Sequence, residues 1–131
     1  MTDNERLCRW LGIEPKYWWV TGKNKDGNEV RFSLGADGEH VARSFAASLT
    51  DGTVDAEYPD LSTREGFWLL WDALSKAQWQ PRLWADESGG NYACVDGDAP
   101  ASAQACETPW AALFAAAMAL MDREESYAGP V

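Results

Sequence analysis

One segment near the middle of the chain constrains its fold most strongly. Ser62 stands three residues before Glu65, which is the capping-box arrangement of a helix start. The apolar residues that follow recur at helical spacing: Phe67, Leu70, Trp71 and Leu74. This pattern predicts a helix over residues 63–77. Because Trp68 and Leu69 lie outside the apolar stripe, the helix must lie between two layers or present aromatic surface to a partner.

A second helix is predicted over residues 108–125. Thr108 suits the N-cap, and Pro109 suits the first helical position, where no backbone donor is needed. Between the two helices, residues 80–85 and 91–95 are β-prone and are separated by a short polar segment with two glycines. We therefore expect an antiparallel hairpin between the helices.

The N-terminal part of the chain predicts a short helix and a hairpin. Residues 4–11 carry leucine and tryptophan at helical spacing, with Asp3 as the expected cap and Gly12 as the expected end. Residues 17–21 and 29–33 are β-prone, and the segment between them is polar and contains glycine. These two segments are expected to pair as a β-hairpin.

Residues 34–63 form the most acidic part of the chain. An amphipathic pattern predicts a helix over 39–49, and a turn is expected at 50–53. Arg43 is the only Lys or Arg in this region. The acidic residues are Asp37, Glu39, Asp51, Asp55, Glu57 and Asp60. We expect a solvated loop after the helix, and we take its acidic side chains as a candidate interaction surface.

Together these elements predict an α+β fold. An antiparallel sheet is expected to pack with helices in an α/β/α-type sandwich, because both C-terminal helices have an apolar face that the hairpin between them must cover. The chain has 131 residues, which suits a single domain over residues 1–131. Trp71, Trp79 and Trp110 are expected in the core of this domain.

The charge balance excludes some partners. The chain has 21 acidic residues against 11 basic ones, a net charge of -10, which repels phosphate backbones and anionic lipid. A partner with a basic surface is favoured, although acidity that only maintains solubility is the alternative. No apolar run approaches the ~20 residues of a membrane span, and the N-terminus lacks the order of a secretory signal. We therefore expect a soluble, cytoplasmic protein.

The sequence offers little catalytic or metal-binding chemistry. His40 has Glu39 beside it, but no Ser or Cys stands in a recognisable nucleophile turn. Cys8, Cys94 and Cys106 are odd in number and widely spaced, so we expect reduced thiols. A zinc site formed by the three cysteines and His40 is the alternative. We expect no catalytic residue, no metal and no cofactor.

The loop after the second hairpin has paired carboxylates, which suit either a hydrolase or a calcium-binding loop. Asp96 and Asp98 are a pair of carboxylates, but the remaining positions of a calcium-binding loop are missing. We expect a solvated turn there. The run 102–106 after it is expected to form a further strand or an edge.

Residues 58–125 resemble the phage ABA sandwich domain, a family of small proteins of unassigned activity from tailed phages and prophages. The resemblance lies in an extended Tyr-Pro-x-x-Ser-Thr lead into an aromatic-rich helix, a hairpin with a Gly turn, and a Glu-Thr-Pro-x-x-Ala-Leu helix start. The matching positions are Ser62, Thr63, Thr108, Pro109 and Ala112. Residues 1–57 are similar only in their opening helix, and Arg64 replaces the usual aspartate after the Ser-Thr pair. The resemblance implies a sandwich fold and a phage setting, and it transfers no chemical role.

These observations suggest a phage-encoded interaction protein that binds and inhibits a host protein. A nucleic-acid-binding defence complex, such as a CRISPR effector, would present Lys and Arg sites that acidic side chains can occupy as a nucleic-acid mimic. The expected contact residues are Asp51, Asp55, Glu57 and Asp60, with Trp18 or Trp19 as an aromatic anchor. Trp18 and Trp19 are adjacent in a strand, so they must point to opposite faces. The alternatives are a small-molecule-binding protein with an aromatic pocket, or an enzyme whose site no motif reveals. The sequence leaves the oligomeric state open.

Overall fold

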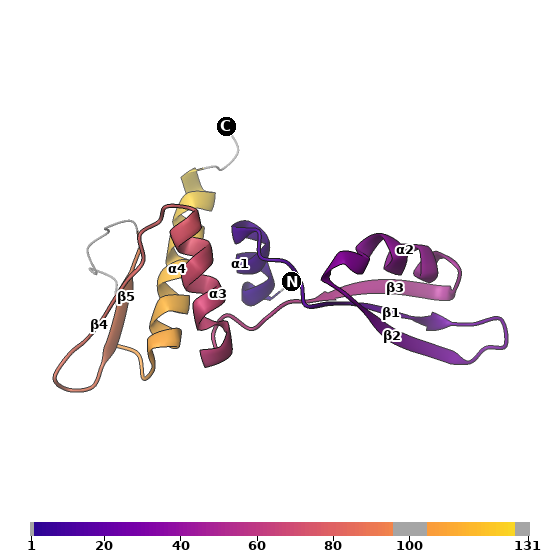
Figure 1. Cartoon of the computed structure of the whole chain (residues 1–131), viewed down its shortest axis with the longest axis horizontal. Coiled ribbons are helices and arrows are strands. Elements are labelled where there is room, and N and C mark those ends of the chain that lie inside the picture. Colours follow the sequence, from indigo (N-terminus) through magenta and orange to yellow (C-terminus); the bar gives the residue numbers. More distant parts are fainter. Residues whose placement is uncertain (1, 96–104, 128–131) are drawn as a thin grey trace. The chain divides into compact units, whose positions relative to one another are not determined.

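A computed structural model describes residues 2–95 and 105–127 of the chain. It has the α+β fold expected from the sequence, with antiparallel sheets packed against helices (Figure 1). The chain divides into two compact units, residues 14–59 and residues 1–13 together with 60–131. We call the first the sheet unit and the second the helical unit. The expectation of a single domain stays a prediction.

The sheet unit contains three strands, a 3-10 turn and one helix. The strands form an antiparallel sheet in the order β2-β1-β3, so β1 lies in the centre. The elements are β1 (Tyr17–Lys23), β2 (Glu29–Gly35), η1 (Ala36–Gly38), α2 (Glu39–Ala47) and β3 (Thr50–Glu57). The predicted hairpin is thereby confirmed, and its strands are each two residues longer than expected.

One face of this sheet packs against α2. Trp18 and Val20 of β1 are buried with Ala42 and Ala46 of α2, and partly buried apolar side chains surround them. The indole N–H of Trp18 donates a hydrogen bond to the carbonyl oxygen of Ala36, at 2.9 Å. The one polar group of the indole therefore has a hydrogen-bond acceptor, so burial of the ring leaves no polar atom unpaired.

The turn predicted at residues 50–53 is wrong, because these residues begin β3. The Thr-Asp-Gly-Thr sequence forms an irregularity in strand pairing, where the register between β1 and β3 shifts and Asp51 has a φ of 53°. Gly52 is required there because a Cβ atom would overlap the carbonyl oxygen of Ala46 in α2. A sequence that is typical of a turn thus forms a β-bulge here, next to the closely packed helix α2. The helix itself ends at Ala47, two residues earlier than expected.

The helical unit contains three helices and a two-stranded hairpin. Its elements are α1 (Asp3–Leu11), α3 (Arg64–Lys76), β4 (Arg82–Ala85), β5 (Asn91–Cys94) and α4 (Pro109–Tyr127). The hairpin β4-β5 forms a sheet of its own, separate from the three-stranded sheet. Figure 1 shows that α3 and α4 run in the same direction, so that both begin at the same end of the unit. Fully buried leucines and Met121 form the centre of this unit: Leu7, Leu61, Leu70, Leu74 and Leu113.

Two of the predicted helix caps are wrong by one residue. The N-cap of α3 is Thr63, whose hydroxyl oxygen accepts a hydrogen bond from the backbone N–H of Gly66 at 3.3 Å. The Ser62 hydroxyl instead donates to the carboxylate of Asp60 at 2.6 Å. In α1 the N-cap is Thr2, and the residue expected to cap, Asp3, is already helical.

Two further predicted helix boundaries are confirmed, the end of α1 and the start of α4. Gly12 ends α1 with a φ of 73°, in the left-handed region that glycine adopts readily. The hydroxyl oxygen of Thr108 accepts from the backbone N–H of Ala111 at 3.2 Å, and Pro109 is the first residue of α4. None of the helices in the described ranges has the length and apolarity needed to cross a membrane.

The segment after β5 is only partly described. Cys106 forms an isolated antiparallel bridge with Asn91, which fits the expected edge pairing at the end of the run 102–106. Residues 96–104 lie outside the described residues, and with them the expected solvated turn at Asp96 and Asp98.

Candidate functional site

The first candidate site is the face of the three-stranded sheet opposite α2. We call it the acidic-aromatic face and define it by Tyr17, Trp19, Asp55 and Glu57; Asp51 belongs to the same edge strand, β3. In the strand register, Trp19 is the cross-strand partner of Asp55, and Tyr17 is the partner of Glu57. The three carboxylates are exposed, and Asp51 lies at the bulge that begins β3. The face thus combines a central row of aromatic rings with an acidic edge strand.

The two tryptophans of β1 lie on opposite faces, as the sequence predicts. Trp18 is 9% exposed and belongs to the core with α2. Trp19 is half-buried on the other face, where the guanidinium of Arg31 from β2 lies 4.5 Å from its ring centroid. This cation–π contact shows that the face of the Trp19 ring accepts a guanidinium group.

The fourth predicted acidic residue lies in the other unit. Asp60 belongs to the helical unit, where its carboxylate accepts hydrogen bonds from the backbone N–H and the hydroxyl of Ser62. The structure therefore brings Asp51, Asp55 and Glu57 onto one strand, β3, whereas Asp60 belongs to the helical unit.

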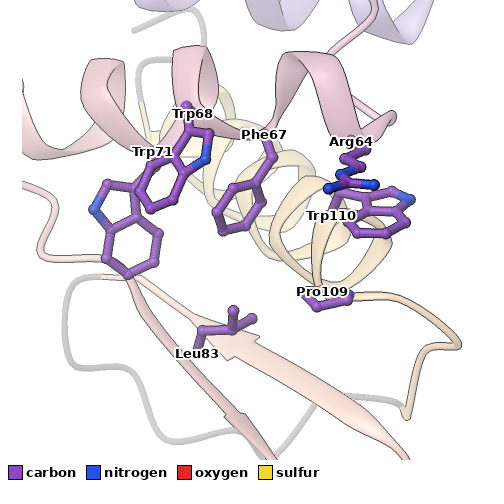
Figure 2. Close-up of a pocket in the computed structure, with 7 residues that line it drawn as sticks. All are labelled: Arg64, Phe67, Trp68, Trp71, Leu83, Pro109 and Trp110. Atoms are coloured by element: carbon purple, nitrogen blue, oxygen red, sulfur yellow. The ribbon is translucent and has the colours of Figure 1, made fainter.

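The second candidate site is a pocket within the helical unit, with a volume of about 620 Å³ (Figure 2). We call it the aromatic pocket. Six of its seven lining side chains are apolar and four of them are aromatic, and they come from α3, β4 and α4. The lining residues are Arg64, Phe67, Trp68, Trp71, Leu83, Pro109 and Trp110.

The aromatic wall of this pocket is formed by rings that already contact one another. The Phe67 ring centroid lies 5.1 Å from that of Trp68, edge to face, and 6.0 Å from that of Trp71. Trp68 is 65% exposed, although burial of such a ring from water is strongly favourable. Trp71 and Trp110, expected in the core, are only half-buried and line the pocket instead.

One end of the aromatic pocket is positively polarised. Arg64 is the first residue of α3, and Pro109 and Trp110 are the first two residues of α4. Figure 2 shows Arg64, Pro109 and Trp110 together at one end of the pocket. Helix N-termini carry a partial positive charge, which adds to that of the guanidinium. Among the described residues, no carboxylate forms a salt bridge with Arg64.

Sequence reasoning identified part of this pocket. The position of Trp68 outside the apolar stripe was the signal for exposed aromatic surface on the first long helix. The contributions of Arg64, Leu83 and Trp110 carried no signal, because they depend on how α3, β4 and α4 come together.

The histidine and the three cysteines are not part of either candidate site. His40 is exposed, and its neighbour Glu39 forms a salt bridge with Arg43 at 2.9 Å. All three cysteines carry reduced thiols, and burial, with added repulsion from Asp60 and Glu5, raises the pKa of Cys8 to about 11. Such a thiol is a poor nucleophile at neutral pH. Within residues 2–95 and 105–127, no group of three or more His, Cys, Asp or Glu side chains is placed to hold a metal ion.

The hairpin turn contains one ionised carboxylate in a hydrogen-bond network. Asp86 accepts from the Ser88 hydroxyl, the Gly90 backbone N–H and the Tyr92 hydroxyl. These hydrogen bonds lower the pKa of Asp86 and raise that of Tyr92. The network closes the β4-β5 turn and contributes no reactive group.

The sequence matches no protein-family model, and neither curated proteins nor solved structures match it significantly. The resemblance of residues 58–125 to the phage ABA sandwich domain therefore stays an expectation.

Proposed function

We propose that this chain is a non-catalytic interaction protein that binds a basic surface of another protein through the acidic-aromatic face. The observation that carries the proposal is the position of Trp19, a half-buried ring in the central strand with Asp55 as its cross-strand partner. A large aromatic side chain next to exposed carboxylates provides both an apolar anchor and charge complementarity to Lys and Arg.

The contact with Arg31 supports a basic partner. The Trp19 ring already receives a guanidinium on one side, from within the sheet unit. An arginine of the partner is accommodated by the same kind of contact, while Asp55 and Glu57 neutralise its charge. The net charge of -10 extends the attraction beyond these side chains and accelerates encounter with a basic partner.

The setting that we propose is a phage-infected bacterial cell, with a nucleic-acid-binding defence protein of the host as the partner. The resemblance of residues 58–125 to a phage family is its support, together with the acidity that lets the chain occupy phosphate-binding sites. A partner of this class presents the Lys and Arg clusters that the acidic-aromatic face complements.

The proposal is tested by comparing two triple variants in pull-downs from bacterial lysate at low salt. One replaces Asp51, Asp55 and Glu57 with their amides; Asn tolerates the positive φ at position 51, so the bulge is kept. The matched control replaces three exposed acidic residues of the helical unit with amides: Asp72, Glu87 and Glu107. Both variants have the same net charge. We expect the first variant to lose a protein that the wild type and the control retain.

The protein identified in this way is then purified and titrated. Trp19→Ala should weaken its binding roughly tenfold or more at every salt concentration, since an anchor contributes through apolar burial. The amide variant should differ from wild type less as salt rises, because screening weakens exposed charge pairs. Trp84→Ala, an exposed aromatic of the helical unit, is the control for Trp19→Ala. Equal losses in the two triple variants would show that net charge alone acts, and would refute the proposed face.

A further inference from the structure

The aromatic pocket has no role in the proposed function, because it lies in the helical unit and the acidic-aromatic face lies in the sheet unit. We propose that this pocket binds a small planar aromatic monocarboxylate. The aromatic ring of the ligand packs against Phe67, Trp68 and Trp71, and its carboxylate is held by Arg64.

The lining favours a flat, apolar ligand. A volume of about 620 Å³ falls within the range of small-molecule sites in proteins. The Phe67 ring packs against those of Trp68 and Trp71, so contacts within the wall hold its rings in place. A preformed wall lowers the ordering cost of binding. A ligand that covers Trp68 also removes an indole that is 65% exposed from water.

The charge at one end favours a single negative group on that ligand. Arg64 is the only charged residue of the lining, and among the described residues it has no carboxylate partner. Its guanidinium matches a carboxylate with two parallel hydrogen bonds. The N-termini of α3 and α4 lie at the same end and add to the positive potential.

The rest of the chain argues against a ligand with several negative charges. A net charge of -10 repels nucleotides and other polyphosphates over distances longer than a single contact. One carboxylate, by contrast, is offset by one guanidinium. Charge complementarity thus selects a monoanion, and the aromatic lining selects a ring system.

The test measures binding of 2-naphthoate and of its neutral analogue 2-naphthamide to the full chain by isothermal titration calorimetry. We expect 2-naphthoate to bind more tightly than 2-naphthamide. Arg64→Gln should weaken 2-naphthoate about tenfold or more and remove its preference over 2-naphthamide, because hydrogen bonds to charged groups are the stronger class. Trp68→Ala should weaken both ligands, since both lose the aromatic contact.

Two control variants repeat the substitutions of Arg64 and Trp68 at residues outside the pocket. Arg82→Gln removes an exposed cation of β4, and Trp84→Ala removes an exposed ring whose cross-strand partner is Tyr92. Neither residue lines the pocket. We expect both to bind 2-naphthoate as the wild type does, with unchanged circular dichroism in all four variants.

Several outcomes overturn the proposal. Equal affinity of 2-naphthoate and 2-naphthamide for the wild type removes the assigned role of Arg64. Unchanged binding in Trp68→Ala places the ligand elsewhere. If a short acidic peptide containing tryptophan binds in an Arg64-dependent manner and 2-naphthoate does not, the pocket receives a protein side chain, and the small-molecule assignment is wrong.

Discussion

Thr63, and not the neighbouring Ser62, caps the first turn of α3. Its hydroxyl oxygen accepts from the Gly66 backbone N–H and its hydroxyl donates to the carbonyl oxygen of Asp60. Thr63→Ala should therefore lower the free energy of unfolding by about 1 kcal/mol, the usual cost of a lost N-cap. Chemical denaturation measures this directly.

Ser62→Ala is the matched control for that measurement. The Ser62 hydroxyl donates to the carboxylate of Asp60 at a partly exposed position, so its loss should cost less than about 0.5 kcal/mol. The reverse order of the two losses would restore the capping box of Ser62 and Glu65 that the sequence suggests.

The sequence alone cannot decide which of two adjacent residues caps α3. Ser62 and Thr63 both have a hydroxyl, and Glu65 fits a capping box only with the first. The backbone of Thr63 is extended, with a φ of -106° and a ψ of 167°, and this places its oxygen over the first turn. Asp60 then engages Ser62, a contact that depends on the path of the chain before the helix. The existence of the helix is predictable, and its first residue is not.

Gly66 allows α3 to pack closely against the segment that precedes it. A Cβ atom at this buried position would overlap the carbonyl oxygen of Asp60 and crowd the Cα of Leu61. Overpacking should cost roughly 1–3 kcal/mol, and the higher helix propensity of alanine offsets ~1 kcal/mol of it, so Gly66→Ala should lower the free energy of unfolding by up to about 2 kcal/mol.

The comparison for Gly66→Ala is Glu65→Ala in the same turn. Glu65 is exposed, and its replacement should change stability by no more than about 0.5 kcal/mol. If Gly66→Ala stabilised the protein, helix propensity would outweigh the predicted overlap, and the close contact with Asp60 would be wrong.

The elements differ in how well their patterns predict them. The helices α3 and α4 have large apolar side chains at helical spacing, and both were predicted with their ends within two residues. Strand β3 was missed because its inward positions are Gly52, Val54 and Ala56, which are small enough to lie under α2. Such an alternation is weak in apolar character, and the Asp51-Gly52 pair is typical of a turn.

The net charge of -10 has opposite consequences for stability and for binding. Mutual repulsion among the carboxylates destabilises the compact state, so adding salt from about 10 to 150 mM should raise the free energy of unfolding by several tenths of a kcal/mol. Over the same range, binding to a basic partner should weaken. Urea denaturation at each salt concentration measures the first effect. A fall in stability with salt would indicate that attractive ion pairs, such as Arg6 with Glu125 at 2.7 Å, outweigh the repulsion.

The two candidate sites differ in what the sequence reveals of them. Adjacent tryptophans in a strand must diverge, so the exposure of one ring was predictable, and the strand register decides that it is Trp19. The acidity of the edge strand follows from composition alone. The aromatic pocket joins residues from Arg64 to Trp110, which meet only through the packing of three elements. No local sequence pattern predicts that these residues converge. The overall acidity of the chain gives no sign that Arg64 lines a pocket.

The tryptophans are divided unevenly between the two units, and this determines what spectroscopy reports. Only Trp18 and Trp19 belong to the sheet unit, and the other six of the eight belong to the helical unit. Indole emission from the intact chain is therefore dominated by the helical unit, and an unfolding curve followed by fluorescence describes mainly that part. Changes in the sheet unit need a probe of their own, such as a fluorinated indole at Trp18, whose resonance responds to loss of the packing against α2.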